Sequence, residues 1–191
     1  MCGRLNITDD PLTKMVSEAL GIKFQTDTNH DLCPTQRVST VACNGALHQL
    51  ETTWGIKPQW SKKLLVNAQA ETVATKPTFK KAFTEHRCVV PCSGWYEWSS
   101  FSGDGKKKYL FESDEDRPVY MAGIYYPILG QMPELVTLTT KPNEVCARYH
   151  HRMPLLIPEK AVEDYLRLPA DMIAALLIAS APRISITETL F

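Results

Sequence analysis

A cysteine directly behind the initiator methionine is the first feature of this chain that could do chemistry. The sequence opens "MCGR", so removal of Met1 would leave Cys2 with a free amine and a thiol on adjacent carbons. That pair can do chemistry that neither group does alone. In most proteins a cysteine at this position is incidental, so the rest of the sequence must decide its meaning.

A carboxylate stands among aromatic residues in the segment "PCSGWYEW", where Glu97 lies between Tyr96 and Trp98. A carboxylate in such surroundings loses water, which raises its pKa and suits it to proton transfer near neutral pH. Strand alternation allows a second interpretation, in which Glu97 faces solvent on the outer side of an edge strand.

Side-chain amides interrupt an apolar segment in "LLVNAQAET", at Asn67 and Gln69. Amides can hold a substrate hydroxyl or a phosphate oxygen without adding charge. They also cap turns, and the sequence alone leaves both roles open.

Two histidines and an arginine precede an apolar run in "YHHRMPLLIP", at His150, His151 and Arg152. Because histidine changes charge near neutral pH, one of the pair is a natural proton shuttle. Paired histidines at a helix end are also common as plain surface residues.

The elements that must position these side chains are mostly strands. Asp10, Pro11 and Gly21 bound a predicted helix with an apolar stripe. Runs rich in β-branched and aromatic residues predict strands at 37–43, 47–56, 87–98, 107–113, 117–127 and 134–140. The segment 100–109 reads as a hairpin connection, and helices are expected at 143–151, 158–168 and 169–179. We predict a single α+β domain over residues 1–191, with a barrel-like, mainly antiparallel core and peripheral helices.

Composition excludes several classes of protein. The 191 residues carry 21 basic and 21 acidic side chains, so a polyanion must be held by a local patch. The first residues lack a signal peptide, and the longest apolar run, "MIAALLIAS", is too short to cross a bilayer, so a cytoplasmic protein without membrane contact is expected.

The six cysteines form no CxxC pair, and we expect neither metal nor cofactor. The five beyond Cys2 are expected to be small buried hydrophobes: Cys33, Cys43, Cys88, Cys92 and Cys146.

Taken together, the motifs resemble those of the SOS-response-associated peptidase (SRAP) family. They are "MCGR", "WGIKPQW", "NAQAET", "FKKAF", "RCVVPCSGWYEW", "PVYMAGIYYP" and "HHRMPLLIP", in the family's order and approximate spacing from Met1 to about Leu168. SRAP proteins are known as sensors of abasic sites in single-stranded DNA and are joined covalently to it through the N-terminal cysteine. The resemblance therefore implies that this chain acts on abasic single-stranded DNA. We expect a monomer that is nucleoid-associated when bound to DNA.

The chemistry of Cys2 agrees with that implication. An abasic deoxyribose equilibrates with an open-chain aldehyde, and an α-amine with a pKa of about 7.7 to 8.0 can add to it at neutral pH. The thiol of the same residue then closes onto the imine carbon, which gives a five-membered thiazolidine. An internal cysteine has no free amine and cannot form this ring.

The resemblance also implies roles for other site residues. Glu97 matches the family glutamate that handles protons during ring opening and crosslinking. His150 matches the histidine that promotes opening of the sugar, and Asn67 the asparagine that positions it. Arg4 matches a position that contacts backbone phosphate.

Further DNA contacts are expected from aromatic and basic side chains. Trp54 and Trp60 resemble a loop that stacks on bases or wedges them apart, with core packing as the alternative for both. Lys80, Lys81 and Arg152 would add contacts to phosphate.

One departure from the family pattern removes a charge. Gln69 stands where the family usually has arginine, so DNA binding is expected to be weaker unless Arg37 or Lys76 substitutes. The chain also stops at "RISITETLF", earlier than typical members, and the last strand or tail is expected to be incomplete.

A second departure adds a charge. The family motif Asn-x-Ala-Pro appears as "DLCP", with Asp31 and Cys33 in place of asparagine and alanine. A carboxylate near the site would favour the charged form of the Cys2 amine and slow its attack.

Two rival functions remain open. A thiol peptidase or amidohydrolase of the N-terminal-nucleophile kind would use Cys2 with His150 or Glu97. A non-catalytic module for single-stranded DNA would bind with salt-sensitive affinity that survives loss of Cys2.

Overall fold

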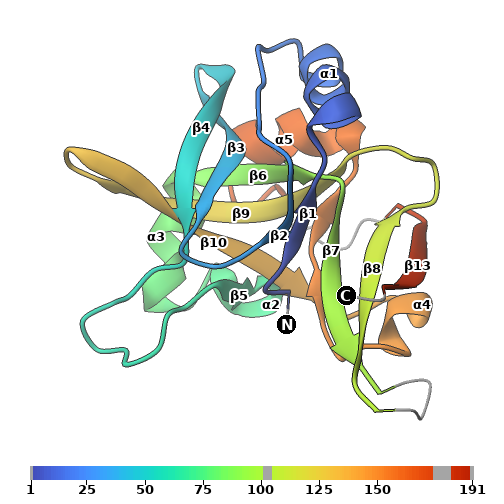
Figure 1. Ribbon diagram of the computed structural model, residues 1–191. Coiled ribbons are helices and arrows are strands. Elements are labelled where there is room, and N and C mark those ends of the chain that lie inside the picture. Colours follow the sequence, from blue (N-terminus) through green and yellow to red (C-terminus); the bar gives the residue numbers. More distant parts are fainter. Residues whose placement is uncertain (1, 101–104, 174–181, 190–191) are drawn as a thin grey trace.

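Five strands close into a barrel at the centre of the computed structural model, which describes residues 2–100, 105–173 and 182–189 (Figure 1). The barrel strands are β3 (Arg37–Asn44), β4 (Ala46–Trp54), β6 (Arg87–Cys92), β9 (Val119–Ile128) and β10 (Gln131–Thr140). They follow the order β10-β4-β3-β6-β9, and pairing of β9 with β10 closes the ring. All of these pairings are antiparallel except the one between β4 and β10.

Short strands extend this barrel at its rim. β5 (Asn67–Gln69) pairs in parallel with β10, while β11 (Met153–Pro154) and β12 (Leu156–Ile157) pair with β10 and β9. The barrel therefore places Asn67 at its edge, beside the middle of β10.

A second sheet has the strand order β13-β8-β7-β1-β2 and carries the chain's amino-terminal segment. Its strands are β1 (Leu5–Ile7), β2 (Asn29–Leu32), β7 (Gly94–Ser99), β8 (Lys107–Ser113) and β13 (Ile184–Thr189). β7 and β8 pair antiparallel across the predicted hairpin connection, of which residues 101–104 lie outside the described residues. β13 pairs with β8 over six residues, so a strand does form in the segment "RISITETLF".

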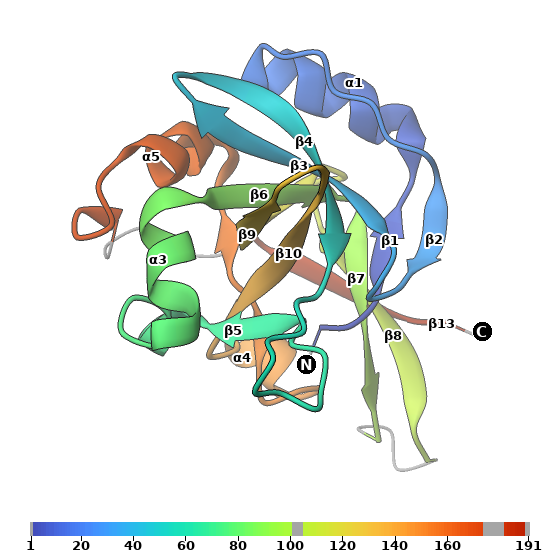
Figure 2. The same ribbon diagram turned by 90° about the vertical axis from the view of Figure 1, so that its left-hand side faces the viewer.

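Helices lie on the outside of the sheets (Figure 2). They are α1 (Asp9–Leu20), α2 (Ala70–Val73), α3 (Pro77–Glu85), α4 (Glu144–Ala147), η1 (Glu159–Ala161) and α5 (Val162–Arg167). In α1, Leu12 and Val16 are buried, and Gly21 ends the helix in the left-handed conformation that glycine adopts without strain. Among the described residues, no helix has the length and apolar character needed to span a membrane.

The predicted α+β fold with a barrel-like core is confirmed, with corrections in detail. The predicted strand over 87–98 is two strands of different sheets, because the chain turns at Ser93 from the barrel into the second sheet. The predicted helix over 143–151 is one short turn, and most of the one over 169–179 lies outside the described residues. Cys88, Cys92 and Cys146 are buried as predicted, whereas Cys33 and Cys43 are partly exposed.

Candidate active site

Cys2 lies inside the protein and is held through its backbone. The residue is 2% exposed, and its carbonyl oxygen accepts a hydrogen bond of 2.8 Å from Nδ2 of Asn67. The hydroxyl of the buried Thr137 donates to Oδ1 of Asn67 at 2.6 Å, because β5 and β10 place these two residues opposite each other. Since Oδ1 receives this hydrogen, the amide is oriented with its NH2 group toward Cys2.

Glu97 is buried on the inner face of β7, which decides between the two interpretations of its position. The residue is 4% exposed, and on the same face Trp95 stacks on Phe111 with ring centroids 5.1 Å apart. A side chain at Gly94 would collide with the backbone oxygen of Phe111, so glycine lets β7 approach β8 closely at this point. The motif "SGWYEW" thus carries the carboxylate of Glu97 inward together with the ring of Trp95, while Tyr96 and Trp98 take the opposite face of β7.

His150 reaches Glu97 from the segment that follows α4. Its Nε2 lies 4.0 Å from Oε2 of Glu97, longer than a hydrogen bond, as such contacts often are before a substrate tightens them. Tyr149 contacts Tyr109 edge to face at 4.7 Å, and Tyr109 pairs across the strands with Glu97. Packing of aromatic rings therefore sets the position of His150 relative to the carboxylate.

The ring tautomer of His150 is linked to the backbone of Arg152. Nδ1 lies 2.9 Å from the carbonyl oxygen and 3.1 Å from the nitrogen of Arg152. If Nδ1 donates to the oxygen, Nε2 of the neutral ring is an acceptor facing Glu97. If Nδ1 accepts from the N–H, Nε2 carries the hydrogen instead, so a shift of tautomer changes which partner can supply a proton.

Burial governs the electrostatics of all three groups. It raises the pKa of Glu97 and lowers the pKa of His150, so both shifts favour the uncharged forms of the pair. Burial, followed by the negative charge of Glu97, raises the pKa of the Cys2 thiol well above its usual value. The site therefore combines a thiol shifted toward its neutral form with an acid–base pair whose two shifts both favour one shared proton.

The two predicted DNA-stacking tryptophans have different environments. Trp54 is fully buried at the end of β4, and its Nε1 donates to the carbonyl of Val66 at 3.1 Å. The stacking role predicted for Trp54 is therefore wrong, and core packing is correct, because no face of its indole is open to a base. Trp60, in the loop that follows, is 70% exposed.

Two of the predicted phosphate contacts are already paired with carboxylates of this chain. Arg152 donates from both terminal nitrogens to Glu71, at 2.8 and 2.7 Å, and its side chain is 13% exposed. Arg4 lies 3.4 Å from Asp31 through its Nε. Of the other predicted contacts, Gln69 is exposed at the start of α2, and Lys80 and Lys81 are exposed on α3.

Lys108 is a residue that the sequence analysis did not single out. Its Nζ lies 3.0 Å from the carboxylate of Asp31, so that carboxylate contacts two cations and its charge is compensated where it stands. The expected effect of Asp31 on the Cys2 amine stays a prediction, and the two cations would weaken it. Within the described residues, no group of three or more histidine, cysteine or acidic side chains is placed to hold a metal ion.

The class of this protein is defined by its fold and its site together. The fold is a small closed barrel with a flanking sheet, and the site holds a buried second-position cysteine, a carboxylate and a histidine. The pattern of the family described as SOS response associated peptidase (SRAP) matches residues 1–187. The chain belongs to this family.

Relatives of known name support the same grouping. The chain is 26% identical over 179 residues to the abasic site processing protein YoqW of Bacillus subtilis, covering 87% of this chain and 80% of that protein. It is 29% identical over 125 residues to the abasic site processing protein YedK of Escherichia coli, covering 63% and 56%. A solved structure from Bordetella bronchiseptica shares the fold over the full length of both chains, with a TM-score of 0.86 at 19% identity.

Proposed function

We propose that this protein processes abasic sites in single-stranded DNA by forming a thiazolidine crosslink through Cys2 after removal of Met1. The observation that carries the proposal is the buried Cys2, tied by its carbonyl to Asn67 and lying within electrostatic range of the Glu97–His150 pair. The names of the relatives YoqW and YedK support abasic DNA as the substrate class. The match of the family pattern to residues 1–187, which include these side chains, supports the same assignment.

The acid–base pair would first open the sugar. Opening the cyclic form of an abasic sugar removes a proton from its anomeric hydroxyl and delivers one to the ring oxygen. Protonated Glu97 and neutral His150 can do both without creating net charge in a buried place. The product is the open-chain aldehyde.

The aminothiol of Cys2 would then close the ring in two additions. The amine attacks the aldehyde carbon, and loss of water leaves an imine. The sulfur adds to the same carbon while the thiol proton passes to the nitrogen, so the overall change is aldehyde plus aminothiol to thiazolidine plus water. Because burial raises the pKa of the thiol, it enters as S–H, and a base of the site relays its proton to the nitrogen.

The Cys2 environment argues against the thiol peptidase rival. A peptidase of that kind attacks with thiolate, which a lowered thiol pKa favours. Here burial, the largest cause, shifts the pKa of the thiol upward. A crosslinking reaction tolerates this, because the first nucleophile is the amine.

The test is incubation of the purified protein with an oligonucleotide carrying one abasic site, followed by denaturing electrophoresis and intact-mass measurement. We expect a denaturation-resistant adduct whose mass equals chain without Met1 plus DNA minus one water. Cys2→Ala should abolish it, while Cys33→Ala, which removes a partly exposed internal thiol, should leave it unchanged. Equal adduct from wild type and Cys2→Ala would show that the mechanism is wrong, and undiminished binding without any adduct would favour the non-catalytic module.

A further inference from the structure

Two cations and one carboxylate meet on the outer face of the second sheet. Oδ1 of Asp31, on β2, lies 3.4 Å from Nε of Arg4 and 3.0 Å from Nζ of Lys108, on β8. Three separate segments contribute these side chains, and together they carry a net charge of about +1. A single carboxylate oxygen shared by two cations leaves positive charge uncompensated.

Lys108 is held in place by more than Asp31. Its Nζ lies 4.0 Å from the ring centroid of Tyr96 and 5.6 Å from that of Trp98, both on the outer face of β7. Contacts between an ammonium group and aromatic faces are attractive and fix the cation against the sheet. The lysine therefore stays in position when Asp31 moves away.

Exposure differs among the three charged side chains. Lys108 is 16% exposed and Arg4 35%, whereas Asp31 is 56% exposed. The carboxylate is thus the outer member of the cluster and covers the two cations. Its removal would leave an arginine and a lysine facing solvent together, which is the donor set that binds phosphate oxygens.

The cluster lies next to the residues of the candidate active site. Arg4 follows Cys2 by two residues, which limits the separation of their Cα atoms to about 7 Å. Lys108 pairs across the strands with Trp98, which follows Glu97 in β7 but points to the opposite face of the sheet. Arg4 is therefore the member of the cluster nearest to Cys2, and a DNA strand whose lesion enters at Cys2 carries its backbone past Arg4 toward this face.

We propose that Arg4 and Lys108 form a phosphodiester-binding site. In the free protein the carboxylate of Asp31 occupies this site, and the DNA backbone displaces it on binding. The proposal rests on the proposed function, which identifies the ligand as single-stranded DNA. Asp31 then acts as an internal competitor. It weakens binding to any single strand and keeps two cations neutralised when no DNA is present.

The test compares affinities for an undamaged single-stranded oligonucleotide, measured by fluorescence anisotropy over a series of salt concentrations. Asp31→Asn should bind several-fold more tightly than wild type at low salt. In the Asp31→Asn background, Lys108→Gln should reverse the gain and lower the slope of log affinity against log salt by about 0.7, the value for one phosphate contact on a single strand. Lys108→Arg should keep both affinity and slope.

The matched control for net charge is Glu163→Gln. Glu163 forms an ion pair of 2.7 Å with Arg167 on α5, and its replacement also adds one unit of charge. If this variant gains as much affinity as Asp31→Asn, or if Asp31→Asn gains none while remaining folded by circular dichroism, the proposed site is wrong.

The two proposals fail separately. If the wild-type protein crosslinks abasic DNA but the Asp31→Asn variant gains no affinity, only the phosphate site is overturned. A gain in affinity without any Cys2-dependent adduct would leave the phosphate site standing and overturn the crosslinking mechanism.

Discussion

Glu97 and His150 each lose water on folding, and the cost falls on their charged forms. Burial raises the pKa of the acid and lowers the pKa of the base. Both groups are therefore driven toward a state with one proton between them, which is the state needed to move protons to and from a sugar. We therefore expect Glu97 and His150 to act in the reaction as one proton-transferring pair rather than as two independent groups.

Non-additive kinetics should reveal this pairing. Glu97→Gln and His150→Gln are each expected to slow crosslinking about 100-fold, the lower range for loss of a general acid or base. The double variant should be no slower than the slower single variant, because each removal already disables the pair. The measurement is the single-turnover rate of adduct formation with excess protein. Multiplying effects in the double variant would contradict a shared function.

At the scale of elements, one buried arginine joins the two helices that cover the barrel near β6. Arg87 is 7% exposed, and its Nε donates to the carbonyl of Tyr165 on α5 at 2.7 Å. Its terminal nitrogens donate to Phe83 near the end of α3, at 2.8 Å, and to Leu168 just beyond α5. The guanidinium thus satisfies carbonyls at the carboxyl ends of both helices, where a positive charge also complements the helix dipole.

Replacing this arginine should weaken the whole fold. Arg87→Met keeps much of the side-chain length but leaves several buried carbonyls without a donor, so the free energy of unfolding should fall by about 2 to 4 kcal/mol. Urea denaturation followed by fluorescence measures the change. The control is Arg167→Met on the exposed side of α5, where loss of the i,i+4 pair with Glu163 and of an exposed hydrogen bond to the carbonyl of Gly45 should cost only about 0.5 to 1 kcal/mol. If both variants lose the same free energy of unfolding, the buried hydrogen bonds of Arg87 do not stabilise the fold more than the exposed contacts of Arg167.

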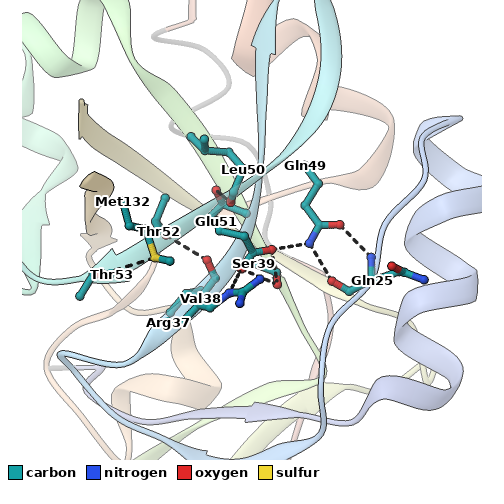
Figure 3. A network of polar contacts seen from close by, with 11 residues as sticks. Gln25, Arg37, Val38, Ser39, Gln49, Leu50, Glu51, Thr52, Thr53 and Met132 are labelled. Carbon is teal, nitrogen blue, oxygen red and sulfur yellow. Dashed lines mark hydrogen bonds and ion pairs between the residues drawn. The ribbon is translucent and has the colours of Figure 1, made fainter. Parts of the chain in front are cut away.

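At the scale of the whole molecule, a polar network connects the segment before β2 to the barrel (Figure 3). The side-chain amide of Gln49, on β4, accepts from the backbone nitrogen of Gln25 at 2.8 Å and donates to its carbonyl at 2.7 Å. Beside it, Glu51 accepts from Nε of Arg37 at 2.6 Å and from the hydroxyl of Ser39 at 3.0 Å. Because Gln25 leads into the flanking sheet and Gln49 belongs to the barrel, the network ties the two sheets together.

Acid should weaken this connection. Burial alone raises the pKa of Glu51, but the hydrogen bonds from Arg37, Gln49 and Ser39 outweigh it, and the pKa is lowered. Because the pKa of Glu51 is lower in the folded than in the unfolded protein, its carboxylate stabilises the fold at pH values above the unfolded pKa of about 4.3. This stabilisation is lost as the pH falls through the folded pKa.

Glu51→Gln should therefore reduce the free energy of unfolding by about 1 kcal/mol at pH 7. The difference from wild type should shrink as the pH falls below the unfolded value of about 4.3 and through the lowered folded pKa. Urea denaturation at pH 7, 5 and 3 checks this. A difference that stays constant or grows in acid would contradict the assigned role of the carboxylate.

The sequence by itself predicted most of the local elements and singled out candidate site residues such as Cys2, Glu97 and His150. The apolar stripe of Leu12 and Val16, closed by Gly21, predicts α1, and β-branched runs predict most strands, because these signals depend on neighbours along the chain. The motifs around Cys2 and Glu97 likewise carry the family resemblance through residue types and spacing alone.

Only the tertiary structure decided which side chains meet and which face they take. Trp54 and Trp60 share one motif, yet the first is in the core and the second is exposed, since burial depends on what the rest of the chain packs against. Thr137 orients Asn67 across 70 residues, and Asp31 reaches Lys108 across 77. Strand alternation fixes a period but not a partner, so contacts between distant segments emerge only when the sheets assemble.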